Sequence, residues 1–286
     1  MKLLNWDHIK EILSDKSTLG LKLLFIFLLA YIISTGTDHK MLKLPLLCIG
    51  LFLTVFFVKK INQPLLWYAF LVILISDLIC DYFVRANHHF LLIYMTILII
   101  VFLHNNRLED LVINFKLVVV IVLFFSGIQK LFSAQFISGD FYYYMINTGS
   151  FFKPILHFDH DMLEVVSGNK TLILELGQTD PNALKSITLR NVVPNLGVIS
   201  RVFAWLTIIL ELTVAVLVLL KPKKVGTHLL FILLILGIFF TRLENGFLAL
   251  LAISGIWLSE NIRIRAVYSI LVLIFLVFIV TKIGFY

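Results

Sequence analysis

Long runs of apolar residues alternate with short polar stretches along almost the whole chain. A helix needs about 20 mostly apolar residues to cross the hydrocarbon core of a bilayer. Such runs predict about nine membrane-spanning helices, at residues 19–35, 42–58, 64–83, 88–104, 111–131, 201–220, 226–243, 246–259 and 265–284. The pattern therefore predicts an all-α fold, a polytopic helical bundle formed by one transmembrane domain over residues 1–286.

Two stretches leave alternatives open. In residues 1–17, apolar positions recur at helical spacing among Lys and Asp, which fits a short helix in the membrane interface or an ordinary polar lead-in. The predicted span at 246–259 is short and follows the polar residues 241–246. Those residues form either a tight turn near one surface or a break that lines a cavity, because unpaired backbone cannot face lipid.

Residues 132–200 form the one sizeable polar segment, an insertion within the transmembrane domain. The part through Phe152 is aromatic and is expected to lie against the membrane. Residues 170–176 and 186–190 alternate or are β-branched, and the turn signal 179–182 separates them. This segment therefore predicts a small β-hairpin.

The composition supports a membrane protein and excludes several other classes. Hydrophobic residues make up 60% of the chain, charged residues only 14%, and the mean hydropathy is +1.00. A large soluble catalytic domain or a nucleotide-binding domain does not fit this composition. The net charge is +7, but the cations are dispersed between apolar runs, so we expect the lipid bilayer as partner and no nucleic acid.

Basic residues in the short connections set the predicted orientation, because they favour the cytoplasmic side. With the amino terminus inside, the outer short connections carry only Lys40, Lys43, Arg85 and Arg242. The inner side receives Lys2, Lys10, Lys16, Lys22, Lys59, Lys60, Arg107, Lys221, Lys223, Lys224, Arg263 and Arg265. The sequence thus predicts a cytoplasmic amino terminus, and an extracytoplasmic carboxyl terminus and 132–200 segment.

Charged residues inside the predicted spans gather toward the outer side. Each costs roughly 2.5–3.5 kcal/mol at the centre of a bilayer, so each needs a partner, a cavity or a function. Glu211 lies near the middle of its span, and its candidate partners are Lys130 and Arg242. The remaining groups are Asp77, Asp81, Arg85, His88, His89 and Glu244. Their clustering predicts a polar cavity that opens outward.

These groups also have structural interpretations. Asp77 and Asp81, four residues apart on one helical face, fit a network with Arg85. His88-His89 fits a solvated loop pair, and Glu244 fits a bridge between helices. The loop residues His157, Asp159, His160 and Asp161 could offer ligands to a divalent ion, but their spacing is not that of a metal motif. We therefore predict no metal site, and the role of these four residues stays open.

Several segments resemble the vitamin K-dependent γ-carboxylase family and its bacterial relatives, the horizontally transferred transmembrane (HTTM) domain proteins. The resemblance rests on Phe124-Phe-Ser-Gly-Ile-Gln-Lys-Leu131, Phe136-Ile-Ser-Gly139, the aromatic run from Phe141 to Met145, Phe151-Phe-Lys-Pro154, Leu210-Glu-Leu212 and Phe239-Phe-Thr-Arg-Leu-Glu-Asn245. It implies the family's membrane fold, a bacterial cytoplasmic membrane as location, and Lys130 at the position of the catalytic base. Glu211 is then the candidate partner of that base.

The chain departs from the family pattern at informative positions. The carboxylase has a basic pair where this chain has Gln129-Lys130, and a histidine where it has Thr241. The 286 residues leave no room for the lumenal domain that captures a carboxylation substrate. The resemblance therefore implies the fold more than the reaction.

Two functions follow as hypotheses. In the first, the chain is a non-catalytic membrane subunit or a lipid- or quinone-binding protein, and Lys130 and Glu211 form a buried pair. In the second, it is a membrane enzyme that uses Lys130 as a base, with Glu211 and Arg242 beside it, on a quinone or another isoprenoid lipid. A carboxylate beside Lys130 favours the charged ammonium over the neutral amine that a base requires. A membrane or extracytoplasmic protein partner stays open.

The predicted topology can be tested with single cysteines at Lys60 and Ser167, in a chain whose native Cys48 and Cys80 are replaced by alanine. In intact cells, an impermeant thiol reagent should label position 167 and not position 60. Labelling at 60 and not at 167 would reverse the orientation and remove the outward-facing cavity with it.

Overall fold

The computed structural model describes residues 6–34, 61–80, 82–83, 87–152, 159–180, 182 and 184–281. The chain forms two compact units. Unit 1 comprises residues 1–120, 217–235 and 244–286, and unit 2 comprises residues 121–216 and 236–243.

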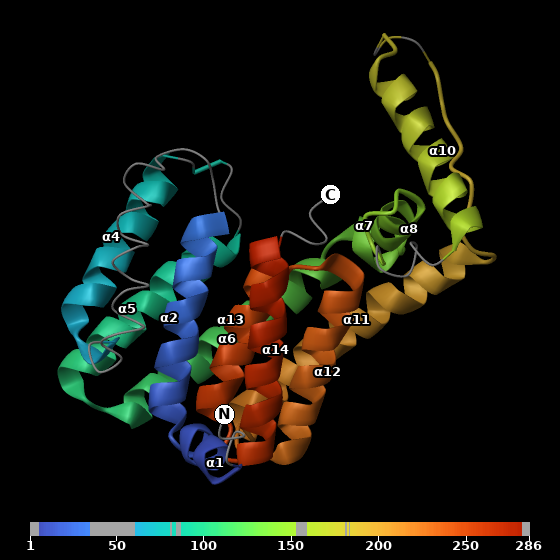
Figure 1. Cartoon of the computed structure of the whole chain (residues 1–286). Helices are drawn as coiled ribbons and strands as arrows, with labels where there is room; N and C mark the ends of the chain where they lie inside the picture. The colour runs from blue at the N-terminus through green and yellow to red at the C-terminus, as the bar shows by residue number, and fades with distance from the viewer. Residues whose placement is uncertain are drawn as a thin grey trace. The chain divides into compact units, whose positions relative to one another are not determined.

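The described part of the chain is helical and contains no strand. In chain order the helices are α1 (Trp6–Ser14), α2 (Lys16–Ser34), α4 (Pro64–Cys80), α5 (Asn87–Asn105), α6 (Leu108–Leu131), α7 (Ala134–Ile137), α8 (Asp140–Asn147), α10 (His160–Gly177), α11 (Leu196–Leu220), α12 (Val225–Arg242), α13 (Asn245–Leu258) and α14 (Ile262–Thr281) (Figure 1). The prediction of an all-α fold is confirmed for these residues.

Five of the helices, α5, α6, α11, α12 and α14, are long and apolar enough to cross a membrane. The apolar helices α4 and α13 are shorter. With 14 residues, α13 rises about 21 Å, less than the ~30 Å hydrocarbon core. A helix lies at every predicted span except 42–58, which falls outside the described residues. The total of about nine spans remains a prediction.

The hairpin expected in the 132–200 segment is corrected by the structure. Residues 170–176 belong to α10, and residues 184–190 have neither helical nor strand structure. The Asp159 side chain caps α10 by accepting hydrogen bonds from the amides of Asp161 and Met162. Inward positions 166, 169, 173 and 176 then follow the helical period, which a short apolar run cannot reveal by itself.

Buried Asn169 attaches the segment after α10 to the helix, and the two run beside each other in Figure 1. Its Oδ1 accepts from the Arg190 amide at 2.8 Å, and its Nδ2 donates to the Arg190 carbonyl at 2.8 Å. The same Nδ2 donates to the Asn147 carbonyl of α8 at 3.0 Å. One amide side chain thus supplies the backbone bonds that a partner strand would have supplied.

In unit 1, α13 packs against α2 and α14 and is buried from Leu248 to Leu258. The Trp257 ring lies 4.2 Å from the Phe115 ring, centroid to centroid, at an interplanar angle of 32°. On its other side it approaches Gly20 of α2 so closely that a Cβ at position 20 would lie 2.6 Å from Trp257 Cζ2. This glycine therefore sets the distance between α2 and α13.

Replacing Gly20 by alanine should destabilise the protein by about 1–3 kcal/mol, because Trp257 is fully buried against Phe115 and cannot move aside. The free energy of unfolding in SDS titrations of detergent-solubilised protein measures this effect. Gly237 of α12 is the matched control, since a Cβ there meets nothing within 4 Å. Equal stability of the two variants would contradict the packing argument.

Candidate functional site

Unit 2 contains a buried ion pair between α6 and α11. Lys130 Nζ donates to both carboxylate oxygens of Glu211, each at 2.6 Å, and to Ser126 Oγ at 2.5 Å. The side chains are 16% and 4% exposed. Lys130, one of the two partners that the sequence predicted for Glu211, therefore donates to both Glu211 oxygens.

The close approach of the two helices depends on the residues next to the ion pair. A Cβ at Gly127 would lie 2.7 Å from Leu212 Cδ2, so the Leu212 side chain of α11 packs directly on this glycine of α6. Ser126 lies one helical turn before Lys130 and presents its hydroxyl on the same side. Small residues thus bring a lysine and a glutamate within bonding distance across two apolar helices.

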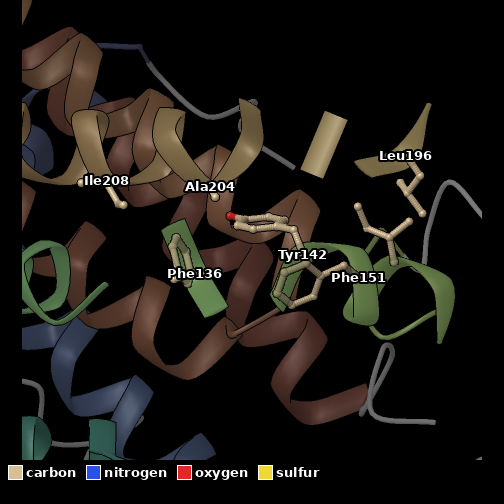
Figure 2. Close-up of a cluster of buried hydrophobic side chains, with 7 residues drawn as sticks. Phe136, Tyr142, Phe151, Leu196, Ala204 and Ile208 are labelled. Carbon is tan, nitrogen blue, oxygen red and sulfur yellow. The ribbon is translucent and has the colours of Figure 1, made fainter. Parts of the chain in front are cut away.

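A second polar contact lies one turn along α11 from Glu211. The Tyr142 hydroxyl of α8 shares a 2.6 Å hydrogen bond with Thr207 Oγ1, and Figure 2 shows this hydroxyl directed toward α11. Burial raises the pKa of Tyr142, the Thr207 hydrogen bond lowers it in part, and the Glu211 charge raises it further. The phenol therefore stays protonated at neutral pH.

Sequence reasoning did not single out Tyr142 or Thr207. Thr207 and Glu211 are four residues apart and share a helix face, a spacing that could have marked the site. Nothing in the sequence separates Tyr142 from its tyrosine neighbours at 143 and 144.

Aromatic side chains enclose this part of unit 2. Phe136, Tyr142, Ile146, Phe151, Leu196, Ala204 and Ile208 form a buried cluster (Figure 2). Lys130 Nζ lies 5.7 Å from the centroid of the Phe136 ring, within cation–π range. Gly139, at φ 88°, places its Cα so near the Arg201 backbone that a Cβ would lie 2.7 Å from the Arg201 nitrogen. The α7–α8 turn is thereby fixed on the first turns of α11.

Arg242, the third predicted site residue, also belongs to unit 2. Its guanidinium carbon lies 6.0 Å from the centroid of the Phe151 ring in the aromatic cluster. The neighbouring Thr241 carbonyl accepts a hydrogen bond from the Phe152 amide at 3.2 Å. The end of α12 is therefore attached to the segment that follows α8.

Several other predicted residues lie in unit 1. Asp77 is 3% exposed on α4, and Glu244 immediately precedes α13. Asp81 and Arg85 fall outside the described residues. Because these groups belong to a different unit from Lys130 and Glu211, the outward-facing cavity that would unite them remains a prediction.

The solvated loop pair expected at His88-His89 is corrected. Both residues belong to α5, and His89 is fully buried. Its Nε2 donates to the Leu74 carbonyl of α4 at 2.8 Å, so Nδ1 is the nitrogen that accepts from the Tyr31 hydroxyl of α2 at 2.9 Å. His89 is buried because both ring nitrogens find partners, and it joins three helices.

The candidate metal ligands His157, Asp159, His160 and Asp161 have different structural positions. Asp159 caps α10, His160 and Asp161 begin that helix, and His157 falls outside the described residues. Across the described ranges, no three His, Cys, Asp or Glu side chains are placed to hold a metal ion together.

Comparison of the chain with protein-family models, curated proteins and solved structures found no match. The Lys130 ammonium has three donors, and all three meet an oxygen of Glu211 or Ser126.

Glu211→Leu alone should destabilise the protein by about 3–5 kcal/mol, because it leaves a buried ammonium without its carboxylate. The double variant Lys130→Met with Glu211→Leu should recover most of this loss, since apolar pairs of similar volume replace buried ion pairs at little cost. SDS unfolding of the single and double variants gives the coupling energy. If the single variant is as stable as the wild type, the pair does not stabilise unit 2.

Proposed function

We propose that the chain is an integral membrane protein in which Lys130 and Glu211 have a structural role. Its function would be that of a non-catalytic membrane subunit or a lipid- or quinone-binding protein with an HTTM/carboxylase-like fold and an outward-facing polar cavity. The observation that carries this proposal is the contact of Lys130 Nζ with both Glu211 oxygens inside unit 2.

This geometry disfavours Lys130 as a base. A base must be a neutral amine with a free lone pair, whereas the Lys130 nitrogen is turned toward three oxygens as a triple donor. The same contacts suit a clamp between α6 and α11, because the charges compensate each other where water is scarce.

The aromatic cluster supports the ligand class of the proposal. Phe141, Tyr143 and Phe152 are partly buried around the cluster, which places flat apolar rings and tyrosine hydroxyls beside one another. Such surroundings suit the ring of a quinone or an isoprenoid chain, which are apolar apart from a few oxygen atoms. The ligand class itself comes from the resemblance of 124–154 to the carboxylase family.

One observation favours the alternative, an enzyme with Lys130 as base. Lys130 and Glu211, which fall on the family's basic and acidic positions, do meet across two helices, and the Tyr142 hydroxyl lies one turn away. In that reading, substrate binding would have to move Glu211 away from the ammonium, with Arg242 as the cation that could receive its charge. The two functions therefore predict different effects of replacing Lys130 by arginine, which stays protonated.

Lys130→Arg should leave a structural protein intact, because arginine keeps the charge and can bond a carboxylate with two donors, whereas it cannot act as a base near neutral pH. We expect the variant to keep the wild-type melting temperature in mild detergent. It should also retain any quinone or isoprenoid lipid that mass spectrometry finds copurifying with the wild type.

The enzymatic alternative is tested with a reduced isoprenoid quinone and an oxygen electrode. Oxygen uptake by the wild type that Lys130→Arg abolishes, at unchanged melting temperature, would overturn the structural role. Lys116→Arg, a change at a half-buried lysine of the same helix, controls for effects of the substitution itself.

A further inference from the structure

Unit 1 carries a surface of basic side chains where several of its helices begin or end. Three pieces of chain form it: the junction of α1 and α2, the turn 221–224 between α11 and α12, and residues 259–265 between α13 and α14. We call this surface the basic edge; its cations are Lys16, Lys221, Lys223, Lys224 and Arg263, with the buried Arg265 beneath them.

Glu260 and Arg265 hold the three pieces together. Glu260 Oε1 accepts from Lys16 Nζ at 2.8 Å and lies 3.7 Å from Lys223 Nζ. Arg265 Nη1 donates to the Ser14 carbonyl, the last residue of α1, at 2.6 Å. The cations of the basic edge therefore belong to one surface, although they come from distant parts of the sequence.

Buried contacts fix the turn between α11 and α12. Thr227 Oγ1 donates to the Lys221 carbonyl at 2.9 Å, so a hydrogen bond joins the first turn of α12 to the start of the 221–224 turn. His228 Nδ1 shares a 3.1 Å hydrogen bond with the Tyr268 hydroxyl of α14. The turn is thus anchored to the helix that carries Arg263 and Arg265.

The carboxylates on this surface do not balance its cations. The Asp15 side chain accepts from the amides of Ser17 and Thr18 at the start of α2. Glu260 is taken by Lys16 and Lys223, and the Lys16 hydrogen bond lowers its pKa despite partial burial. The exposed cations Lys221, Lys224 and Arg263 have no ion pair among the residues described.

Helix dipoles add to this positive potential. The amino-terminal ends of α12 and α14 lie at the basic edge, and neither helix has an acidic residue in its first turn. Acidic residues are the favourable choice at such ends, and cations are unfavourable there. Negative charge from outside the chain would relieve this repulsion.

We propose that the basic edge binds the phosphates of anionic phospholipids at the membrane surface, through Lys221, Lys224 and Arg263. The candidate spans α12 and α14 begin at this edge, so these side chains lie where apolar helix surface gives way to headgroups. Clusters of basic residues next to spans attract anionic lipid, and lysine stems can extend along the apolar surface. The proposal does not depend on the role of Lys130 and Glu211.

The test compares melting temperatures of the full chain in nanodiscs of phosphatidylcholine and of an equal mixture of phosphatidylcholine and phosphatidylglycerol. The wild type should melt at a higher temperature in the anionic nanodiscs, and molar NaCl should remove the difference, because salt screens exposed charges. The triple variant Lys221→Gln, Lys224→Gln and Arg263→Gln should lose more than half of the shift. A wild type without a shift would overturn the proposal even if the triple variant does not fold.

The matched control replaces two lysines and one arginine that are exposed in unit 2, Lys170, Lys185 and Arg190, by glutamine. This control should keep the full wild-type shift. An equal loss in both triple variants would show a net-charge effect and contradict a binding surface. An equal stabilisation of the wild type by soluble glycerol phosphate would assign the edge to a free phosphate and overturn the membrane contact.

Discussion

Two opposite charges placed among apolar helices must lie against each other, and the Lys130–Glu211 pair meets this requirement in unit 2. The pair sits where Gly127 lets α6 approach Leu212, so the packing and the charges depend on each other. A larger residue at 127 would displace the Leu212 side chain, and a longer distance between Lys130 and Glu211 would leave both ions poorly compensated. The contact therefore constrains where α11 can lie on α6, and the aromatic cluster forms around that position.

The same rule, that a buried polar group needs partners, accounts for other fixed points in the molecule. His89 joins α2, α4 and α5 because both of its ring nitrogens are bonded. Asn169 holds residue 190 on α10 by bonding its backbone on both sides. In a chain with so few polar residues, each buried one narrows the set of packings that satisfy it.

Exposed charged residues, unlike buried ones, do not need a partner within the protein, because water solvates them. At the basic edge, Glu260 joins three pieces of chain, while Lys221, Lys224 and Arg263 remain exposed to whatever lies outside. Exposed ion pairs contribute little to the stability of a protein. A role in binding a group outside the chain therefore explains these cations better than a role in stabilising the fold. The buried pair in unit 2 thus stabilises helix packing, whereas the basic edge in unit 1 is a surface for binding.

The sequence by itself determined the helical class and the positions of the apolar helices, because an apolar run of sufficient length has few alternatives to a helix in lipid. It also narrowed the partner of Glu211 to two cations, since a charge at mid-span demands one. Only the tertiary structure showed that Lys130 bonds both Glu211 oxygens, because that contact depends on which helices touch. The sequence failed at residues 170–176, where a short β-branched run fits a strand or a helix and the Asp159 cap and the packing of α10 decide. It failed again at His88-His89, because burial of a polar ring depends on the Tyr31 and Leu74 partners that only the fold supplies.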